Sequence, residues 1–211
     1  MFFDATRLTA YYLAALALIL TPGPDTLYVL ARSVGQGRKA GIVSALGIFV
    51  GGLFHIGAAA LGLSALLATS ALAFSVVKWG GAAYLVWMGV QMLRSQDGAP
   101  EEVRALPALG LRRIFRDGVV TNVLNPKVAV FFLAFLPQFV DASAGSTGLQ
   151  FLGLGLMFAV TGTSWLVLLA ATAGAFGGWM RRNPRVAAWQ KRVTGGVFVV
   201  LGARLALQRQ A

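Results

Sequence analysis

Six apolar blocks, each about 20 residues long or longer, dominate this sequence and leave few folds open to it. They cover approximately residues 8–31, 41–68, 72–94, 112–139, 148–179 and 193–210. Only helices and closed barrels satisfy their backbone hydrogen bonds in lipid, and these blocks are continuous rather than alternating as barrel strands are. The blocks therefore predict an all-α integral membrane protein with six transmembrane helices.

Basic residues are concentrated in alternate connections between the blocks. The first, third and fifth connections carry them, at Arg32, Arg38, Lys39, Arg94, Arg104, Arg112, Arg113, Arg116, Arg181, Arg182, Arg185, Lys191 and Arg192. The positive-inside rule then places the odd connections in the cytoplasm and both termini outside it. The net charge of +11 is explained by this topology, whereas a nucleic-acid-binding surface needs a basic face on a soluble domain.

The third connection divides the chain into two halves of three blocks each. We expect one polytopic domain, 1–211, made of a first repeat at 1–95, a cytosolic linker at 96–110 and a second repeat at 111–211. Because three is an odd number, related halves must cross the membrane in opposite orientations. Inverted repeats of this kind are typical of secondary transporters.

Helix-breaking residues interrupt the first and fourth blocks at comparable positions. The first contains "TPGPD" at 21–25 and the fourth "NPK" at 125–127, and aligning their prolines sets Asp25 opposite Lys127. Proline removes a backbone donor and disfavours helix in the preceding residue. The freed helix ends must face protein or a watery cavity. The pattern predicts broken first and fourth helices whose breaks face each other near the bilayer midplane.

Chemistry other than transport finds no support in the motifs. The chain has no HExxH, no GxSxG, no Walker sequence and no cysteine, so we expect no enzyme activity, no cofactor and no metal. The start "MFFDATR" lacks the basic region of a cleavable signal, so the first block is expected to remain. Energy would come from proton exchange, from the membrane potential or from the substrate gradient.

Two motifs give the chain a family resemblance. "LTPGPD" at 20–25 and "NVLNPKVAVFFLAFLPQFV" at 122–140 resemble the LysE/RhtB family of bacterial amino-acid exporters. The resemblance implies export of amino acids or close derivatives across the bacterial cytoplasmic (inner) membrane. The wording "FFLAFLPQFV" is more similar to the homoserine, threonine and neutral amino-acid branch than to the lysine and arginine branch. The alternatives are a passive channel or facilitator for small zwitterions and a membrane scaffold that transports nothing.

Asp25 and Lys127 are the main candidates for substrate binding. A charge inside the bilayer costs about 2.5–3.5 kcal/mol on insertion scales, so it usually faces a cavity or an opposite charge. The two residues either form an ion pair that joins the repeats or bind the ammonium and the carboxylate of an amino acid. Both roles can alternate within one transport cycle.

The full predicted substrate site combines the two breaks with hydroxyl groups of the fifth block. It comprises Thr21, Pro22, Gly23, Pro24, Asp25, Asn122, Asn125, Pro126, Lys127, Thr161 and Ser164. The asparagines would serve equally well as helix caps, and the hydroxyls as bonds to their own helix. Asp25 and His55, the only histidine, are candidates for proton coupling, although His55 also suits a bond between helices.

Small residues and lipid-facing side chains indicate the remaining partners. "GIFVG" at 47–51 has the spacing that allows close helix contact, and other glycine pairs look similar. Basic residues such as Arg38 and Lys39 suit lipid headgroups. Six spans with many small residues permit a homodimer, and the sequence favours neither dimer nor monomer.

Overall fold

The computed structural model describes residues 5–63, 71–94, 108–182 and 184–207, and every regular element in these ranges is a helix. The α-helices are α1 (Ala5–Leu20), α2 (Pro24–Gln36), α3 (Arg38–Ala58), α5 (Ala71–Arg94), α6 (Leu111–Val123), α7 (Pro126–Val130), α8 (Thr147–Arg182) and α9 (Pro184–Leu207). Short π-helical and 3₁₀ segments adjoin them at Ala59–Leu63, Phe131–Phe135, Leu136–Phe139 and Ala142–Ala144. The all-α prediction is confirmed for these residues.

Two of the described helical stretches, Arg38–Gly62 and Thr147–Ala173, are long and apolar enough to cross a membrane. Two bent helix pairs raise the number to four if each pair forms one span. Helix α5 coincides with the third predicted block and α9 overlaps the sixth, while most of the predicted linker lies outside the described residues. The count of six spans and their inverted arrangement remain predictions.

Both predicted helix breaks are present. Helix α1 ends at Leu20 and α2 begins at Pro24 with a bend of 47°, while α6 ends at Val123 and the segment Pro126–Phe139 begins with a bend of 45°. A proline occupies the first helical position after each break, where its missing N–H costs nothing and its fixed φ suits the helix. The sequence signals that interrupt the apolar blocks thus start new helices rather than merely kink old ones.

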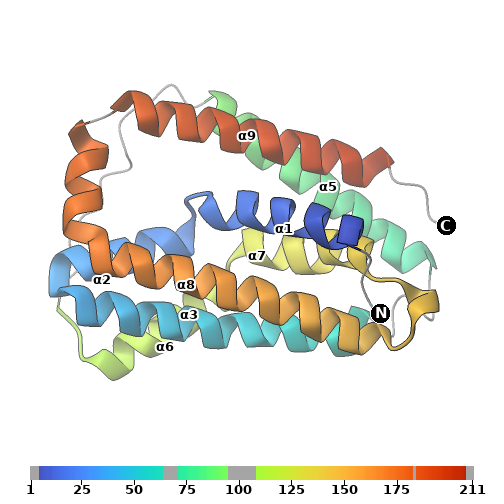
Figure 1. Ribbon diagram of the computed structural model, residues 1–211, viewed down its shortest axis with the longest axis horizontal. Helices are drawn as coiled ribbons and strands as arrows, with labels where there is room; N and C mark the ends of the chain where they lie inside the picture. Colours follow the sequence, from blue (N-terminus) through green and yellow to red (C-terminus); the bar gives the residue numbers. More distant parts are fainter. Residues whose placement is uncertain (1–4, 64–70, 95–107, 183, 208–211) are drawn as a thin grey trace.

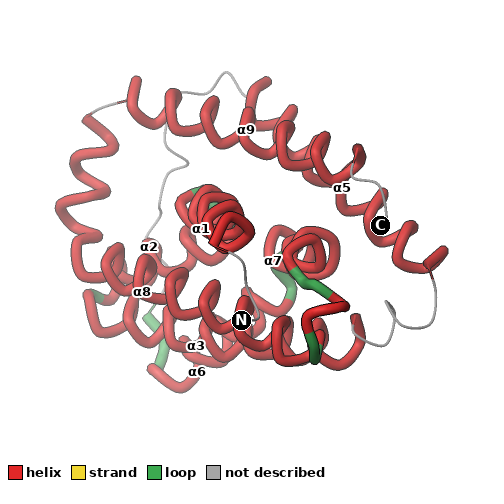
Figure 2. The backbone as a smooth tube through the Cα atoms, turned by 45° about the vertical axis from the view of Figure 1, so that its right-hand side comes forward, coloured by secondary structure: helices red, strands yellow, loops and turns green. Residues whose placement is uncertain are grey.

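One half of each broken helix, α1 and α7, lies in the middle of the molecule (Figure 1). Figure 1 shows α1 and α7 side by side between the α5–α9 pair on one side and α3, α6 and α8 on the other. Figure 2 views α1 and α7 nearly end-on and shows the same surrounding helices. Because each break is enclosed by other helices, its exposed backbone groups can be satisfied by protein.

Side chains join α1 to the segment Pro126–Phe139 along its length. Tyr11 packs against Phe139 with ring centroids 5.4 Å apart, and its hydroxyl donates to Leu154 O at 2.5 Å. Beyond it, Arg7 Nη1 lies 2.7 Å from Asp141 Oδ2. Hydrogen bonds from the hydroxyl and N–H of Ser143, with a further bond from Arg7, lower the pKa of Asp141 to about 2. Asp141 therefore stays ionised at neutral pH.

Glycines bring α3 and α6 into direct backbone contact, as the "GIFVG" spacing predicts. A Cβ at Gly51 would stand 2.8 Å from Val119 O, and one at Gly47 would overlap Phe115 O. From the other helix, a Cβ at Gly118 would stand 2.8 Å from Ser44 O. These glycines are required by packing, and the close contact fixes Asn122, at the end of α6, beside α3.

The first and fifth connections differ from their predicted loops. Helix α2 continues to Gln36 and α3 begins at Arg38, so Gly37, with φ of 83°, forms the whole connection. Arg32 is consequently buried within α2, where Nη1 donates to Gln36 Oε1. Helix α9 begins at Pro184 rather than near 193. Helices α2 and α9 both extend beyond the apolar blocks into polar residues. The blocks were delimited by apolar residues, which a helix does not require.

Candidate substrate site

The C-terminal end of α1 is capped by a side chain from the other break. Lys127 Nζ donates to Thr21 O at 2.9 Å and to Leu18 O at 3.2 Å. The Thr21 hydroxyl donates to Ala17 O at 2.6 Å. A helix end leaves such carbonyls without partners, and a cation also complements the negative end of the helix dipole. Lys127 therefore stabilises the first break directly.

Gly23 leaves room for this ammonium group. A Cβ at residue 23 would stand 3.1 Å from Lys127 Nζ and 3.3 Å from its Cε. Both distances are tighter than ordinary van der Waals contact, so a larger residue would displace the lysine from the carbonyls. The glycine between the two prolines is thus explained by the contact with Lys127.

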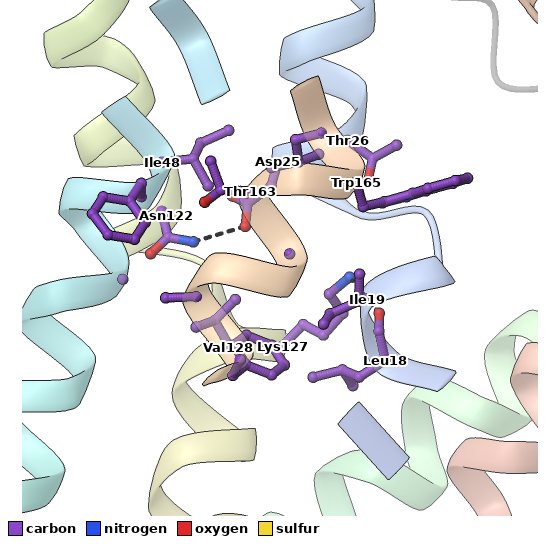
Figure 3. A pocket seen from close by; sticks show the side chains of 16 residues that line it. Leu18, Ile19, Asp25, Thr26, Ile48, Asn122, Lys127, Val128, Thr163 and Trp165 are labelled. Atoms are coloured by element: carbon purple, nitrogen blue, oxygen red, sulfur yellow. Dashed lines mark hydrogen bonds between the residues drawn. The ribbon is translucent and has the colours of Figure 1, made fainter. Parts of the chain in front are cut away.

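Two asparagines organise the second break. Asn125 caps α7, because its Oδ1 accepts from Lys127 N at 3.1 Å. Asn122, in the last turn of α6, donates from Nδ2 to Asp25 Oδ2 at 2.8 Å. Figure 3 shows Asn122 joined to Asp25 on one side of a cavity and Lys127 extending towards Leu18. The two breaks therefore face each other. Asp25, after the first break, is bonded to Asn122 of the second, and Lys127, after the second break, is bonded to carbonyls of the first.

Asp25 and Lys127 line one cavity without contacting each other directly. In the described part of the chain, Asp25 is bonded to Asn122, and Lys127 to the two carbonyls of α1. Both are buried, with exposed fractions of 7%. In this conformation the opposite charges are held apart by separate partners, so the space between them is available to a ligand.

Three polar atoms at the breaks have no hydrogen-bond partner among the described residues: Asp25 Oδ1, Asn122 Oδ1 and Asn125 Nδ2. Their residues are 7%, 4% and 1% exposed. The other atoms of each amide fix its orientation, because Asn122 must donate to a carboxylate and Asn125 must accept from an N–H. Unpartnered buried polar groups are costly, and the two acceptors belong to residues that line the cavity, so they suit a ligand that donates hydrogen bonds; Asn125 is outside the lining, and its side chain lies beside Asp25.

The cavity between the breaks has a volume of about 50 Å³. At roughly 10–15 Å³ per water on this measure, it has room for about three to five waters, the scale of a small metabolite. Its lining comprises Leu18, Ile19, Asp25, Thr26, Ile48, Phe49, Gly52, Asn122, Lys127, Val128, Phe158, Ala159, Gly162, Thr163, Trp165 and Leu166. A few polar groups therefore meet at one part of a mainly apolar wall, as in most small-molecule sites.

The predicted residues fall into three groups. Asp25, Asn122 and Lys127 line the cavity. Thr21, Pro22, Gly23, Pro24, Asn125 and Pro126 form the turns that position them, and of these Thr21 and Asn125 are each 1% exposed. Thr161 and Ser164 are outside the lining, and Ser164 is exposed with its hydroxyl donating to Val160 O at 2.9 Å.

Helix α8 presents a different face from the one chosen from sequence. Four of the six α8 residues that line the cavity, Ala159, Gly162, Thr163 and Leu166, follow the spacing i, i+3, i+4 and i+7 of a single helical face, and Phe158 and Trp165 widen it on one side. Thr161 and Ser164 fall beside that stripe. Periodicity could have grouped Thr163 with its neighbours, but only the position of α8 against α1 and α3 shows which face meets the cavity.

His55 lies behind the site rather than in its lining. Its Nε2 is 3.0 Å from Asn122 O, so this nitrogen carries the hydrogen, and its ring stacks on Phe132 with centroids 5.8 Å apart. The bond ties α3 to the last turn of α6. His55 is thus linked to Asp25 through one residue, Asn122, whose side chain and carbonyl serve the two contacts.

Comparisons with known proteins agree on one family. A family model described as LysE type translocator matches residues 16–209. An uncharacterized membrane protein of Pseudomonas aeruginosa is 35% identical over 205 residues, which are 95% of each chain. A leucine efflux protein of Enterobacter sp. is 31% identical over 204 residues, 97% of each chain, and one of Salmonella typhimurium is 29% identical over 196 residues, 93% of this chain and 92% of its own. No solved structure gives a significant match.

Proposed function

The chain belongs to the LysE type translocator family, and on that premise we propose that it exports amino acids from the cytoplasm by secondary transport. The single observation that carries the proposal is the pair of unpartnered acceptors in the cavity lining, Asp25 Oδ1 and Asn122 Oδ1. Two acceptors, together with the ammonium group of Lys127, complement the ammonium and the carboxylate that all α-amino acids share.

The substrate ammonium binds at Asp25. Its N–H groups donate to Asp25 Oδ1 and Asn122 Oδ1, which have no other donor among the described residues. Hydrogen bonds between ionised groups are about twice as strong as neutral ones. Asn122 Nδ2 meanwhile keeps Asp25 Oδ2 in place.

The substrate carboxylate is received from the other side by Lys127. Its ammonium group has three hydrogens, and two donate to Thr21 O and Leu18 O, which leaves the third for a ligand. The zwitterion thus connects the two breaks, which are also joined by the bonds of Asn122 to Asp25 and of Lys127 to the α1 carbonyls.

The substrate is a neutral amino acid with an apolar side chain. Apart from its polar end, the cavity is bounded by aliphatic and aromatic groups such as Ile48, Phe158 and Leu166. A charged side chain would find no counter-ion there and would lose its hydration. The relatives named leucine efflux proteins are consistent with this choice.

Transport proceeds by alternating access between two inverted repeats, with the breaks near the bilayer midplane of the cytoplasmic membrane. Asp25 also couples transport to protons, because among the described residues it is the one carboxylate that lines the cavity. A proton entering from outside and a substrate ammonium compete for the same oxygen atom. His55, bonded to Asn122 O, is the second candidate for this coupling.

Efflux from vesicles preloaded with a panel of labelled amino acids tests the function. We expect saturable efflux of leucine and other neutral apolar members, dependent on an imposed proton gradient or membrane potential, and no efflux of lysine or aspartate. Flux that rises linearly with concentration would favour a channel instead. Vesicles that release none of the panel would leave only a scaffold role.

Topology is tested by single cysteines, since the chain has none of its own. With both termini outside, Ser95→Cys is expected in the cytoplasm and Ala144→Cys, after the fourth block, outside. An impermeant thiol reagent added to intact cells should label position 144 and leave position 95 unlabelled until the cells are permeabilised. The opposite pattern would reverse the orientation and the direction of export drawn from it.

A further inference from the structure

Gly162 lies on the cavity face of α8, and neither the packing nor the backbone requires a glycine there. A Cβ at this position would stand 3.7 Å from Ile19 Cγ1 and 3.9 Å from its Cδ1, which is ordinary van der Waals contact. Among the described residues, positive φ values occur only at Gly37 and Gly145, so Gly162 has a conformation open to any residue. Glycine in the interior of a helix is less stable than alanine.

Two other glycines next to the site, Gly155 and Gly52, have different surroundings. At Gly155, two turns earlier on α8, a Cβ would stand 2.8 Å from Ile56 Cγ1 and 3.2 Å from Phe132 Cε1, so packing excludes a larger residue. A Cβ at Gly52, the other cavity glycine, would stand 3.9 Å from Ala159 Cβ and 3.9 Å from Asn122 Oδ1, one of the groups proposed to bind the charged end of the substrate. Gly162 differs from both, because its Cβ would be in ordinary van der Waals contact and would meet only the aliphatic side chain of Ile19 within 4 Å.

We propose that Gly162 determines specificity by setting the greatest length of substrate side chain that the cavity accepts. The inference rests on the proposed function, in which Asp25, Asn122 and Lys127 hold the charged groups of an amino acid. No atom of these three lies within 4 Å of a Cβ at residue 162. The space beside Gly162 and Ile19 is therefore free for the aliphatic end of the substrate.

One added methyl group removes about the volume of one methylene from that space. A methylene more or less in an apolar pocket changes discrimination by roughly 10- to 200-fold. Gly162→Ala should consequently act on long substrates and spare short ones, because the charged groups still bind as before. Gly162→Val should move the limit to a shorter side chain again.

A homologous series of amino acids distinguishes a limit on side-chain length from a general effect of Gly162 on transport. Vesicles would be preloaded with labelled alanine, 2-aminobutyrate, norvaline or norleucine, which differ by single methylenes. For Gly162→Ala we expect efflux of alanine within about twofold of wild type and efflux of norleucine lowered about tenfold or more. Gly57→Ala on α3 is the matched control, because its Cβ would meet nothing within 4 Å; its profile should equal that of wild type.

Each other outcome would overturn the inference. An equal loss across the series would place Gly162 with the groups that bind the charged end, and an unchanged profile would remove it from the substrate path. A variant that fails to fold, judged by its elution as a single species in detergent, would make Gly162 a packing residue like Gly155. If the wild-type protein exports no member of the series, the proposed function itself fails. That result comes from the wild-type protein alone and is therefore distinct from a failure of the inference about Gly162.

Discussion

Replacement of Asp25 by asparagine is expected to abolish export while the protein still folds. Asparagine keeps the size of the side chain and can accept from Asn122 Nδ2 through its own oxygen, so the bond between the breaks survives. It removes the negative charge that receives the substrate ammonium. Hydrogen bonds to charged groups contribute about 1.5–3 kcal/mol, so substrate affinity should fall roughly 10- to 150-fold. The proton site is lost with the same charge, so even saturating substrate should not restore coupled efflux.

Asp117→Asn provides the matched control for this substitution. Asp117 lies on α6, five residues before Asn122, and its ion pairs, at 3.8 Å to Arg113 and 3.6 Å to Arg116, lie outside the cavity. We expect vesicle efflux of leucine from this variant to match wild type. Normal efflux from Asp25→Asn, measured in the same vesicles, would remove Asp25 from both substrate binding and coupling.

The positions of the helix breaks could be predicted from the sequence because their cause is local. Proline and glycine act on the backbone within a few residues, whatever lies around them. The positions of Pro24 and Pro126 therefore mark the starts of α2 and α7 directly. That the breaks should face each other followed from their equivalent places in the two halves, and the bonds from Asn122 and Lys127 agree with that expectation.

The partners of Lys127 could not be predicted from the sequence. The charges of Asp25 and Lys127 suggested that they bind each other or a substrate, whereas Lys127 donates to carbonyl oxygens more than 100 residues away. Every residue has a carbonyl, so composition gives no sign of which one will lack a partner. That depends on where α1 ends relative to α7, which is a property of the packed structure.

The role of Arg32 shows a limit of charge counting. Together with Arg38 and Lys39 it marks the first connection as basic, and the count supports a cytoplasmic location. In the structure Arg32 is 5% exposed, and its guanidinium lies 5.4 Å from the centre of the Tyr28 ring. A hydropathy scale assigns every arginine to the polar connections. Hydrogen bonding and contact with an aromatic ring nevertheless allow an arginine to be buried within a helix. Arg38 and Lys39 are exposed and still support the topology.

Lys127→Met is expected to abolish export and, unlike Asp25→Asn, also to destabilise the protein. Methionine nearly matches the length of lysine but cannot donate to Thr21 O, whose one side-chain donor among the described residues is Lys127 Nζ. A buried carbonyl left without a partner costs about 1–3 kcal/mol. Thermal unfolding in detergent should therefore begin at a lower temperature for Lys127→Met than for Asp25→Asn, and both variants should fail to release leucine from preloaded vesicles.

Exchanging the two charges distinguishes a substrate site from a simple ion pair. In the double variant Asp25→Lys with Lys127→Asp, a carboxylate at position 127 would face the carbonyls of Leu18 and Thr21, which only a donor can satisfy. A lysine at position 25 would meet Asn122 Nδ2, another donor. Each charge has surroundings suited to its own sign, so we expect the exchanged protein to release no leucine. Recovery of near-normal efflux would mean that the two residues serve chiefly each other, and the substrate would then have to bind through Asn122, Thr163 and the apolar wall.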